Sequence, residues 1–163
     1  MSLLQPDYYY SSLFAVDLAM LSERGIRGVV IDLDNTILPR DTNELEQRAY
    51  DWVAEARSRF EVMIVSNNTH SYPKEIAAQL GLPIMTHALK PMPRAFRAAM
   101  RQLGTTRRTT AVIGDQLFTD VFGGNLAGAT TVLVDPLVES DLPHTLALRK
   151  LTAPIIRHRR PLA

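Results

Sequence analysis

Residues 29–36 read Val29-Val30-Ile31-Asp32-Leu33-Asp34-Asn35-Thr36. The apolar run is short, β-branched and preceded by Gly28, which is typical of a strand buried on both faces. Asp32 and Asp34 are two residues apart, so they would share one side if the strand continued. Two carboxylates this close repel each other. A divalent cation would remove the conflict, as would a covalent role for one carboxylate and a proton-transfer role for the other. A plain turn is the alternative, because Asp, Asn and Thr are common in turns.

The rest of the chain alternates short apolar runs with helical patterns. We expect strands over residues 28–33, 62–65, 83–85, 110–113 and 130–134. We expect helices over 13–24, 73–80, 95–103 and 142–151. A further helix is expected to begin after an N-cap at Asn43, and another to end near Ala127. Such alternation predicts a Rossmann-like three-layer α/β sandwich with a mostly parallel sheet and helices on both faces.

The sequence predicts one domain over residues 1–163, with an N-terminal arm and helix over 1–25 and a basic tail over 154–163. Residues 1–12 are expected to form an ordered arm rather than a strand of the core sheet. Gly123 and Gly124 lie inside a predicted helix, where they cost helix propensity, so we expect the backbone to pack closely there.

Composition excludes several classes of protein. The chain has 163 residues, 46% of them hydrophobic, which suits one globular domain. Its net charge is only +1, so no global attraction to nucleic acid is expected, and the absence of cysteine excludes disulfides and thiol nucleophiles. We find neither a signal peptide nor an apolar stretch of the roughly 20 residues that span a membrane. We therefore expect a cytoplasmic location, with peripheral membrane contact as an open alternative.

Polar clusters follow several of the predicted strands. Asp32 and Asp34 follow the first strand, Ser66 and Asn67 the second, and Asp115 with Asp120 a later one, while Lys90 precedes a helix on the same side. In parallel sheets of this kind, ligands bind outside the carboxyl ends of the strands. We therefore expect these side chains to share one crevice.

The predicted crevice has more negative than positive charge, because Lys90 offsets only part of the carboxylate cluster. A hard cation with oxygen ligands fits, and Mg²⁺ characteristically combines one or two carboxylates with substrate phosphate. Asp32 can attack phosphorus, and Asp34 can protonate the leaving oxygen and then deprotonate water. Ser66, Asn67 and Lys90 can hold the phosphate oxygens. The residues thus predict a phosphatase, with Thr36 as a further substrate-binding candidate.

These residues resemble the four motifs of the haloacid-dehalogenase (HAD) superfamily, in the family's order and spacing. The matching motifs are Asp32-Leu33-Asp34-Asn35-Thr36, Ser66, Lys90 and Gly114-Asp115 with Asp120. The resemblance implies that Asp32 is the nucleophile, Asp34 the acid/base, Ser66 a phosphate donor and Lys90 a stabiliser of the phosphoenzyme. It also implies that Asp115 binds Mg²⁺ with Asp32 and the main-chain carbonyl of Asp34, and that Asp120 is a ligand through water or an outer acceptor.

A narrower resemblance is to the subclass IIIA phosphatases of the YqeG type, related to mitochondrial phosphatidylglycerophosphatases. The residues that carry it are Ile64-Val65-Ser66-Asn67-Asn68, Lys90-Pro91 and the run 114–125, and the arm around 4–7 is also similar. This implies an aspartyl-phosphate mechanism with phosphatidylglycerophosphate as substrate. The intervals between the motifs leave no room for a large cap domain. An uncapped crevice would admit a bulky or membrane-held substrate, or would need contacts within an oligomer to close it.

Other interpretations remain open at this point. The substrate could be a soluble sugar or nucleotide phosphate, or the chain could be a phosphoacceptor or adaptor domain without turnover. A lipid substrate would be met at a membrane surface. Aromatic and apolar residues of the arm would then lie at the interface, and basic residues of the tail would face anionic lipid: Tyr8, Tyr9, Tyr10, Leu13 and Phe14 in the first group, and Arg157, Arg159 and Arg160 in the second.

Overall fold

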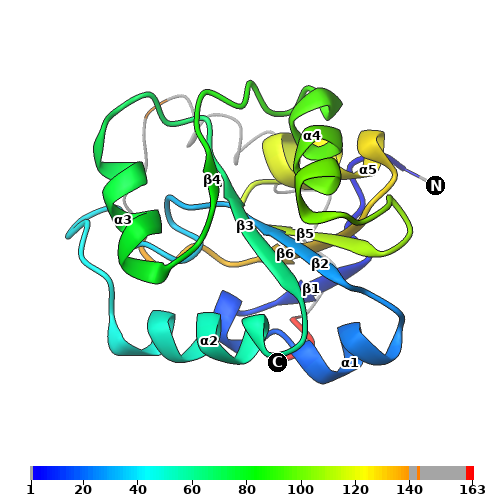
Figure 1. Cartoon of the computed structure of the whole chain (residues 1–163), viewed down its shortest axis with the longest axis horizontal. Helices are drawn as coiled ribbons and strands as arrows, with labels where there is room; N and C mark the ends of the chain where they lie inside the picture. The colour runs from blue at the N-terminus through cyan, green and yellow to red at the C-terminus, as the bar shows by residue number, and fades with distance from the viewer. Residues whose placement is uncertain (1, 140–142, 144–160) are drawn as a thin grey trace.

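The computed structural model describes residues 2–139, 143 and 161–163. They contain a six-stranded sheet in the order β1-β6-β5-β2-β3-β4, in which every neighbouring pair is parallel (Figure 1). The strands are β1 (Tyr8–Tyr10), β2 (Gly28–Ile31), β3 (Glu61–Val65), β4 (Ile84–Met85), β5 (Thr110–Gly114) and β6 (Thr130–Val134). The predicted helix over 142–151 and most of the tail over 154–163 lie outside the described residues.

Helices cover both faces of this sheet (Figure 1). The helices α1 (Leu18–Glu23), α2 (Gln47–Arg57) and α3 (Tyr72–Leu80) pack on one face with Val29 and Ile31 of β2. On the other face, Val30 contacts the layer formed by α4 (Pro93–Leu103) and α5 (Gly123–Ala127). Because alternate residues of a strand point to opposite faces, β2 is buried on both sides. The predicted three-layer α/β sandwich is confirmed.

Several local predictions are also confirmed. The helices α3 and α4 end at Gly81 and Gly104, which adopt left-handed conformations with φ of 65° and 68°. A β-carbon on Gly123 would lie 2.6 Å from the ring of Phe96, and one on Gly124 would lie 2.7 Å from the methyl group of Thr131. The two glycines therefore allow the close packing that their positions predict.

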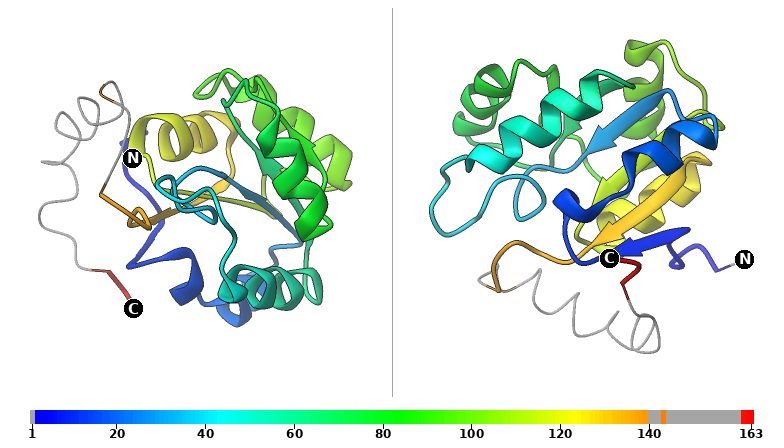
Figure 2. Two further views of the ribbon diagram at one scale, coloured as in Figure 1. Left: turned by 90° about the vertical axis from the view of Figure 1, so that its left-hand side faces the viewer. Right: turned by 90° about the horizontal axis from the view of Figure 1, so that it is seen from below.

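The N-terminal arm corrects one prediction, because residues 8–10 form the edge strand β1 beside β6 (Figure 2). Tyr10 and Leu13 are 3% and 0% exposed in the core, so neither is available to a membrane in this fold. Three successive tyrosines show no alternation of polar and apolar residues, and the partner strand lies far along the chain. Both facts conceal the strand in the sequence.

Two helix starts also differ from prediction. The helix predicted over 13–24 is divided into a 3₁₀ turn, η1 (Leu13–Ala15), and α1, whose N-cap is Asp17 rather than Ser12. The Asp17 side chain accepts a hydrogen bond of 2.8 Å from the amide of Met20, which favours a new helix start there. Asn43 does not cap α2; it adopts a left-handed conformation in the preceding loop, and Glu46 is the residue before the helix.

The connections leave the carboxyl edge of the sheet without a large cap. Between β2 and β3 the only helix is α2, and between β3 and α4 the chain forms α3 and β4. Over the residues that the structure covers, no helix is long and apolar enough to cross a membrane.

Candidate active site

Strand register aligns the polar clusters at one edge of the sheet. Ile31 of β2 pairs with Ile64 of β3 on one side and with Ile113 of β5 on the other. The residues that follow these strands therefore emerge together, which brings Asp32 near Asp115. The polar clusters that were predicted to share one crevice thus follow strands that end side by side.

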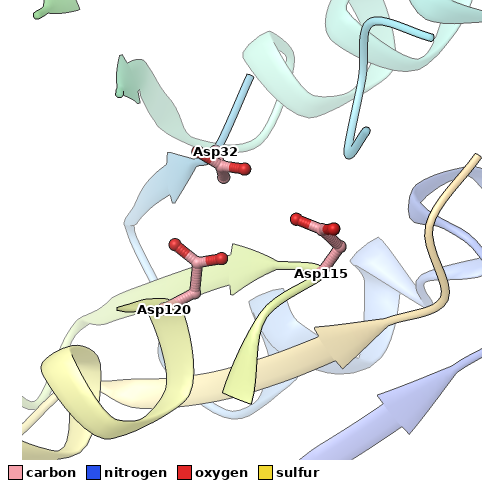
Figure 3. Close-up of side chains that lie close together, drawn as sticks. All are labelled: Asp32, Asp115 and Asp120. Carbon is pink, nitrogen blue, oxygen red and sulfur yellow. The ribbon is translucent and has the colours of Figure 1, made fainter. Parts of the chain in front are cut away.

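Three carboxylates meet at this edge (Figure 3). One oxygen from each of Asp32, Asp115 and Asp120 lies within 4.8 Å of the other two, and all three residues are buried. Asp32 follows β2 and Asp115 follows β5. Asp120 projects from a π-helical segment, η2 (Leu117–Phe122), which brings it back over the end of β5. The oxygen-only donor set suits a hard divalent cation.

Lys90 lies between two of these carboxylates. Its Nζ is 2.6 Å from Asp32 Oδ1 and 2.7 Å from Asp120 Oδ1. Burial alone would lower the pKa of Lys90, but the charges and hydrogen bonds of Asp120 and Asp32 raise it above its ordinary value. The ammonium group therefore stays charged and fixes the position of the Asp32 carboxylate.

Asp32 and Asp120 share the one Lys90 ammonium, so among the described residues this single positive charge does not neutralise both carboxylates. Burial, and to a smaller extent the charge of Asp32, raise the pKa of Asp120 to about 6, although Lys90 opposes the shift. Buried carboxylates in excess of their cationic partners are unfavourable. A divalent cation held by Asp32, Asp115 and Asp120 would relieve this excess, so these residues fit a metal ion.

Gly114 provides the space that Asp120 occupies. A β-carbon on Gly114 would lie 2.3 Å from both Cγ and Oδ2 of the Asp120 side chain. No side chain fits there unless Asp120 moves. The Gly114-Asp115 pair of the motif thus has a steric basis, because the glycine admits one carboxylate and the next residue supplies another.

Asp34 has different neighbours from Asp32. Its Oδ1 accepts a hydrogen bond of 2.6 Å from the hydroxyl of Tyr72, the first residue of α3, and its Oδ2 accepts one of 3.1 Å from the Asn68 amide. Asn68 also donates to the Tyr72 hydroxyl at 2.5 Å, which closes a small network. Burial and the hydrogen bond to Asp34 raise the pKa of Tyr72, so its hydroxyl stays protonated and remains a donor.

Sequence reasoning did not give Tyr72 or Asn68 a place in the site. Asn68 belongs to the Ser66-Asn67-Asn68 run, so its position after β3 was a usable signal. No signal marked Tyr72, because it lies six positions after Ser66 and only the fold brings its hydroxyl back to Asp34.

The predicted substrate-binding residues lie around the same carboxylates. The Thr36 hydroxyl is 3.3 Å from Asp115 Oδ1 and 3.4 Å from Asp32 Oδ2. The Ser66 hydroxyl accepts a hydrogen bond of 3.0 Å from the main-chain N–H of Asn68. Asn67 forms two hydrogen bonds with the main chain of Lys90, at 2.7 and 3.0 Å. Those bonds fix the loop that presents Lys90.

The loop after β2 is joined to the segment after β6. Asn35, which has a φ of 64°, accepts a main-chain hydrogen bond of 3.0 Å from Leu137. Its side chain also pairs with the main chain of Val138, at 3.1 and 3.3 Å. The turn between Asp34 and Thr36 is thereby held by the segment that follows β6, two strands away in the sheet.

Known proteins resemble this chain in sequence and in fold. The "Probable phosphatase YqeG" of Bacillus subtilis (strain 168) is 39% identical over 137 residues, which cover 83% of this chain and 80% of that protein. Phosphatidylglycerophosphate phosphatase 1 of Arabidopsis thaliana is 25% identical over 138 residues, which cover 78% of this chain and 40% of that longer protein. The HAD-hydrolase YfnB of Bacillus subtilis, solved bound to magnesium, superposes with a TM-score of 0.56 at 18% identity, over 66% of this chain and 88% of that chain.

The structural match confirms the HAD-like fold. The family model described as mitochondrial PGP phosphatase matches residues 1–139. With the identity to YqeG, this match makes the chain a phosphoric monoester hydrolase of the HAD type and a member of the mitochondrial PGP phosphatase family.

Proposed function

We propose that this protein hydrolyses phosphatidylglycerophosphate in a magnesium-dependent reaction that passes through an aspartyl-phosphate on Asp32. One observation carries the mechanism: the two carboxylates after β2 have different partners. Asp32 contacts the ammonium of Lys90, whereas Asp34 contacts the neutral donors Tyr72 and Asn68. A carboxylate held by a cation suits a nucleophile, and one held by neutral donors suits a group that exchanges a proton.

In the first step, a carboxylate oxygen of Asp32 forms a bond to phosphorus while the bond from phosphorus to the leaving oxygen breaks. Asp34 gives its proton to that oxygen, which departs as an alcohol. A protonated carboxyl group still has acceptor sites for both Tyr72 and Asn68, so the network can hold Asp34 in either protonation state.

In the second step, water attacks phosphorus in the aspartyl-phosphate. Asp34 takes a proton from that water, the bond from phosphorus to Asp32 breaks, and inorganic phosphate leaves. Asp32 returns to its carboxylate form and Asp34 to its acid form, so the cycle closes with one water consumed. Ser66 and Lys90 are the proposed donors to the phosphate oxygens.

Asp32, Asp115 and Asp120 are the proposed metal-binding side chains, and we propose that the main-chain carbonyl of Asp34 completes the set. When bound, Mg²⁺ supplies positive charge that offsets the negative charge of the phosphoryl group and its carboxylate neighbours. The side chain of Asp34 accepts hydrogen bonds from Tyr72 and Asn68 instead of binding the metal in this proposal, so it is the group that transfers a proton.

The choice of substrate rests on the relatives and on the short connections that follow β2 and β3. The Arabidopsis relative is named for phosphatidylglycerophosphate, and the family model carries the same substrate in its description. The connections after β2 and β3 leave the carboxyl edge without a large cap, so a head group attached to a lipid can reach it.

A substrate panel tests this proposal. Phosphate release is measured from phosphatidylglycerophosphate in mixed micelles and from soluble sugar and nucleotide phosphates, each with Mg²⁺ and with excess chelator. We expect the highest kcat/KM on the lipid and no release with chelator. A higher kcat/KM on a soluble phosphate would overturn the proposed lipid substrate. Full activity in excess chelator would overturn the proposed metal requirement.

A further inference from the structure

Positive charge is concentrated in one part of the chain. The whole chain has 18 basic and 17 acidic residues, yet residues 76–114 contain no Asp or Glu. The basic residues of this segment are Lys90, Arg94, Arg97, Arg101, Arg107 and Arg108. The segment includes all of α4, so this helix is a locally basic element in a nearly neutral protein.

The outer side of α4 presents three of these arginines. Arg94, Arg97 and Arg101 are exposed, and their spacing places them along one side of the helix, opposite the buried residues such as Phe96 and Ala99. Within the part of the chain that the structure describes, none of the three has a carboxylate partner within 4.0 Å. Arg97 donates a hydrogen bond of 3.3 Å to the carbonyl of Leu126. The positive charge of this side is therefore not neutralised by neighbours.

Large apolar side chains are exposed on the segments that carry Lys90 and Asp115. Leu89 and Met92, which flank Lys90 in the chain, are 73% and 54% exposed. Phe118, three residues after Asp115, is 38% exposed and stacks on Phe122 with ring centroids 5.6 Å apart. Exposed apolar groups next to a functional site mark a contact surface.

A groove joins the two kinds of side chain. It has a volume of about 580 Å³, and its lining includes Met85, His87, Leu89, Met92, Arg94 and Arg101. Met85 belongs to the edge strand β4, so the groove lies between the edge of the sheet and α4. It begins at the loop that carries Lys90 and continues along the helix.

We propose that Leu89, Met92, Arg94, Arg97 and Arg101, here called the α4 surface, dock the protein on a bilayer that contains anionic lipid. Guanidinium groups bind phosphate oxygens in bidentate geometry, and apolar tips can enter the head-group region. The docked surface brings the Lys90 loop to the lipid head groups. The proposal rests on the proposed lipid substrate. It moves the membrane contact away from the arm, where Tyr10 and Leu13 are buried.

Vesicle sedimentation tests the docking. The unmodified chain is mixed with vesicles of phosphatidylcholine alone or with 30% phosphatidylglycerol, at low and high salt. We expect binding that requires the anionic lipid and weakens with salt. Arg94→Glu with Arg101→Glu should lower the partition coefficient at least tenfold, because each basic residue near such a surface contributes about fivefold.

The matched control is Arg107→Glu with Arg108→Glu, which changes the net charge equally. These residues lie in the turn between α4 and β5, at the amino-terminal ends of the strands, whereas Asp32 follows the carboxyl end of β2. We expect less than a threefold loss in this control, and melting temperatures that show both variants to be folded. Equal losses in the two variants, or no binding of the unmodified chain, would overturn the docking surface. The docking surface would also be overturned if the unmodified chain formed a dimer without vesicles, and if the Arg94 and Arg101 changes dissociated that dimer while the control changes did not.

The two proposals fail separately. These vesicles contain no phosphatidylglycerophosphate, so binding does not depend on turnover. Hydrolysis of the lipid in micelles without vesicle binding would leave the proposed function standing and remove the α4 surface. Vesicle binding without hydrolysis would do the reverse.

Discussion

The surroundings of Asp32 and Asp34 differ although the two residues follow the same strand. At Asp32 the shortest side-chain contact is ionic: Lys90 lies at 2.6 Å, with Asp120 and Asp115 close by. At Asp34 the two hydrogen-bond donors are neutral: the Tyr72 hydroxyl at 2.6 Å and the Asn68 side-chain amide at 3.1 Å. The charge of Arg40 acts on Tyr72, whose pKa it lowers against the larger effect of burial. The two carboxylates leave β2 in nearly the same place, so the difference arises from the segments that return to them. Neighbours, rather than residue type, distinguish the proposed roles.

The largest expected effect is at Asp32. Asp32→Asn should lower kcat by at least about 10⁴-fold, because an amide is a poor nucleophile and a weaker metal ligand. Phosphate release from a soluble ester measures the loss, and the melting temperature shows that the variant is folded. Appreciable turnover by a pure preparation would remove the covalent mechanism and with it the contrast between the two sites.

Asp34→Asn should lower kcat by about 10³-fold, since one group acts as acid and then as base. The loss should be greater for alkyl phosphates than for p-nitrophenyl phosphate, whose leaving oxygen needs little protonation. A loss that is equal for both substrates would mean that Asp34 does not protonate the leaving group.

Gly114→Ala tests the ionic surroundings of Asp32 without changing a charge. The added methyl group would displace the Asp120 carboxylate, so we expect kcat/KM to fall by about 10²-fold through misplacement of the ionic cluster. Gly25→Ala is the control: Gly25 has a φ of 85° and no atoms within 4 Å of the added carbon. It should cost stability and leave kcat/KM unchanged. An active Gly114→Ala enzyme would show that the position of Asp120 matters little.

Tyr72→Phe tests the neutral side and should lower kcat about tenfold, because Asp34 loses one of its two donors. The loss should again be greater for poor leaving groups. Tyr50→Phe removes a similar hydroxyl, which donates to Gln79 at 3.2 Å on the surface, and should have no effect on kcat. Equal leaving-group dependence in Tyr72→Phe and the unmodified enzyme would reduce Tyr72 to a structural role.

The smallest effect concerns stability. Mg²⁺ should raise the melting temperature by a few degrees, because it binds the folded state and relieves the carboxylate cluster. Asp115→Ala should abolish this shift, and Tyr72→Phe should retain it, since Tyr72 does not contact the cluster. Differential scanning fluorimetry measures the shift. Its loss in both variants would mean that the surroundings of Asp32 and those of Asp34 do not act separately.

The sequence predicted the sheet, its helices and the convergence of the polar clusters, because each of these follows from local pattern and from strand polarity. Residues 29–31, 62–65 and 111–113 are continuous apolar runs, and Pro73, Gly81 and Gly104 mark helix ends. Such signals are contained within a few neighbouring residues.

What the sequence did not predict depends on contacts between distant residues. The strand β1 is recognisable only beside β6, and the hydrogen bond from Tyr72 to Asp34 depends on how α3 packs against the sheet. The break at Val16 depends on capping by Asp17, which competes with a continuous helix. In each case a tertiary contact or a cap outweighs the local propensity.

The pairing of β1 with β6 affects the order in which the strands of the sheet can form during synthesis. Asp7 hydrogen-bonds to Thr131, 124 residues further along, and Tyr8–Tyr10 pair with Val132–Val134. During synthesis these tyrosines leave the ribosome long before their partner strand exists, so the buried side of Tyr10 stays exposed until β6 is made. Closing so long a loop is slow, so the edge at β1 is expected to be the last part of the sheet to form on a nascent chain.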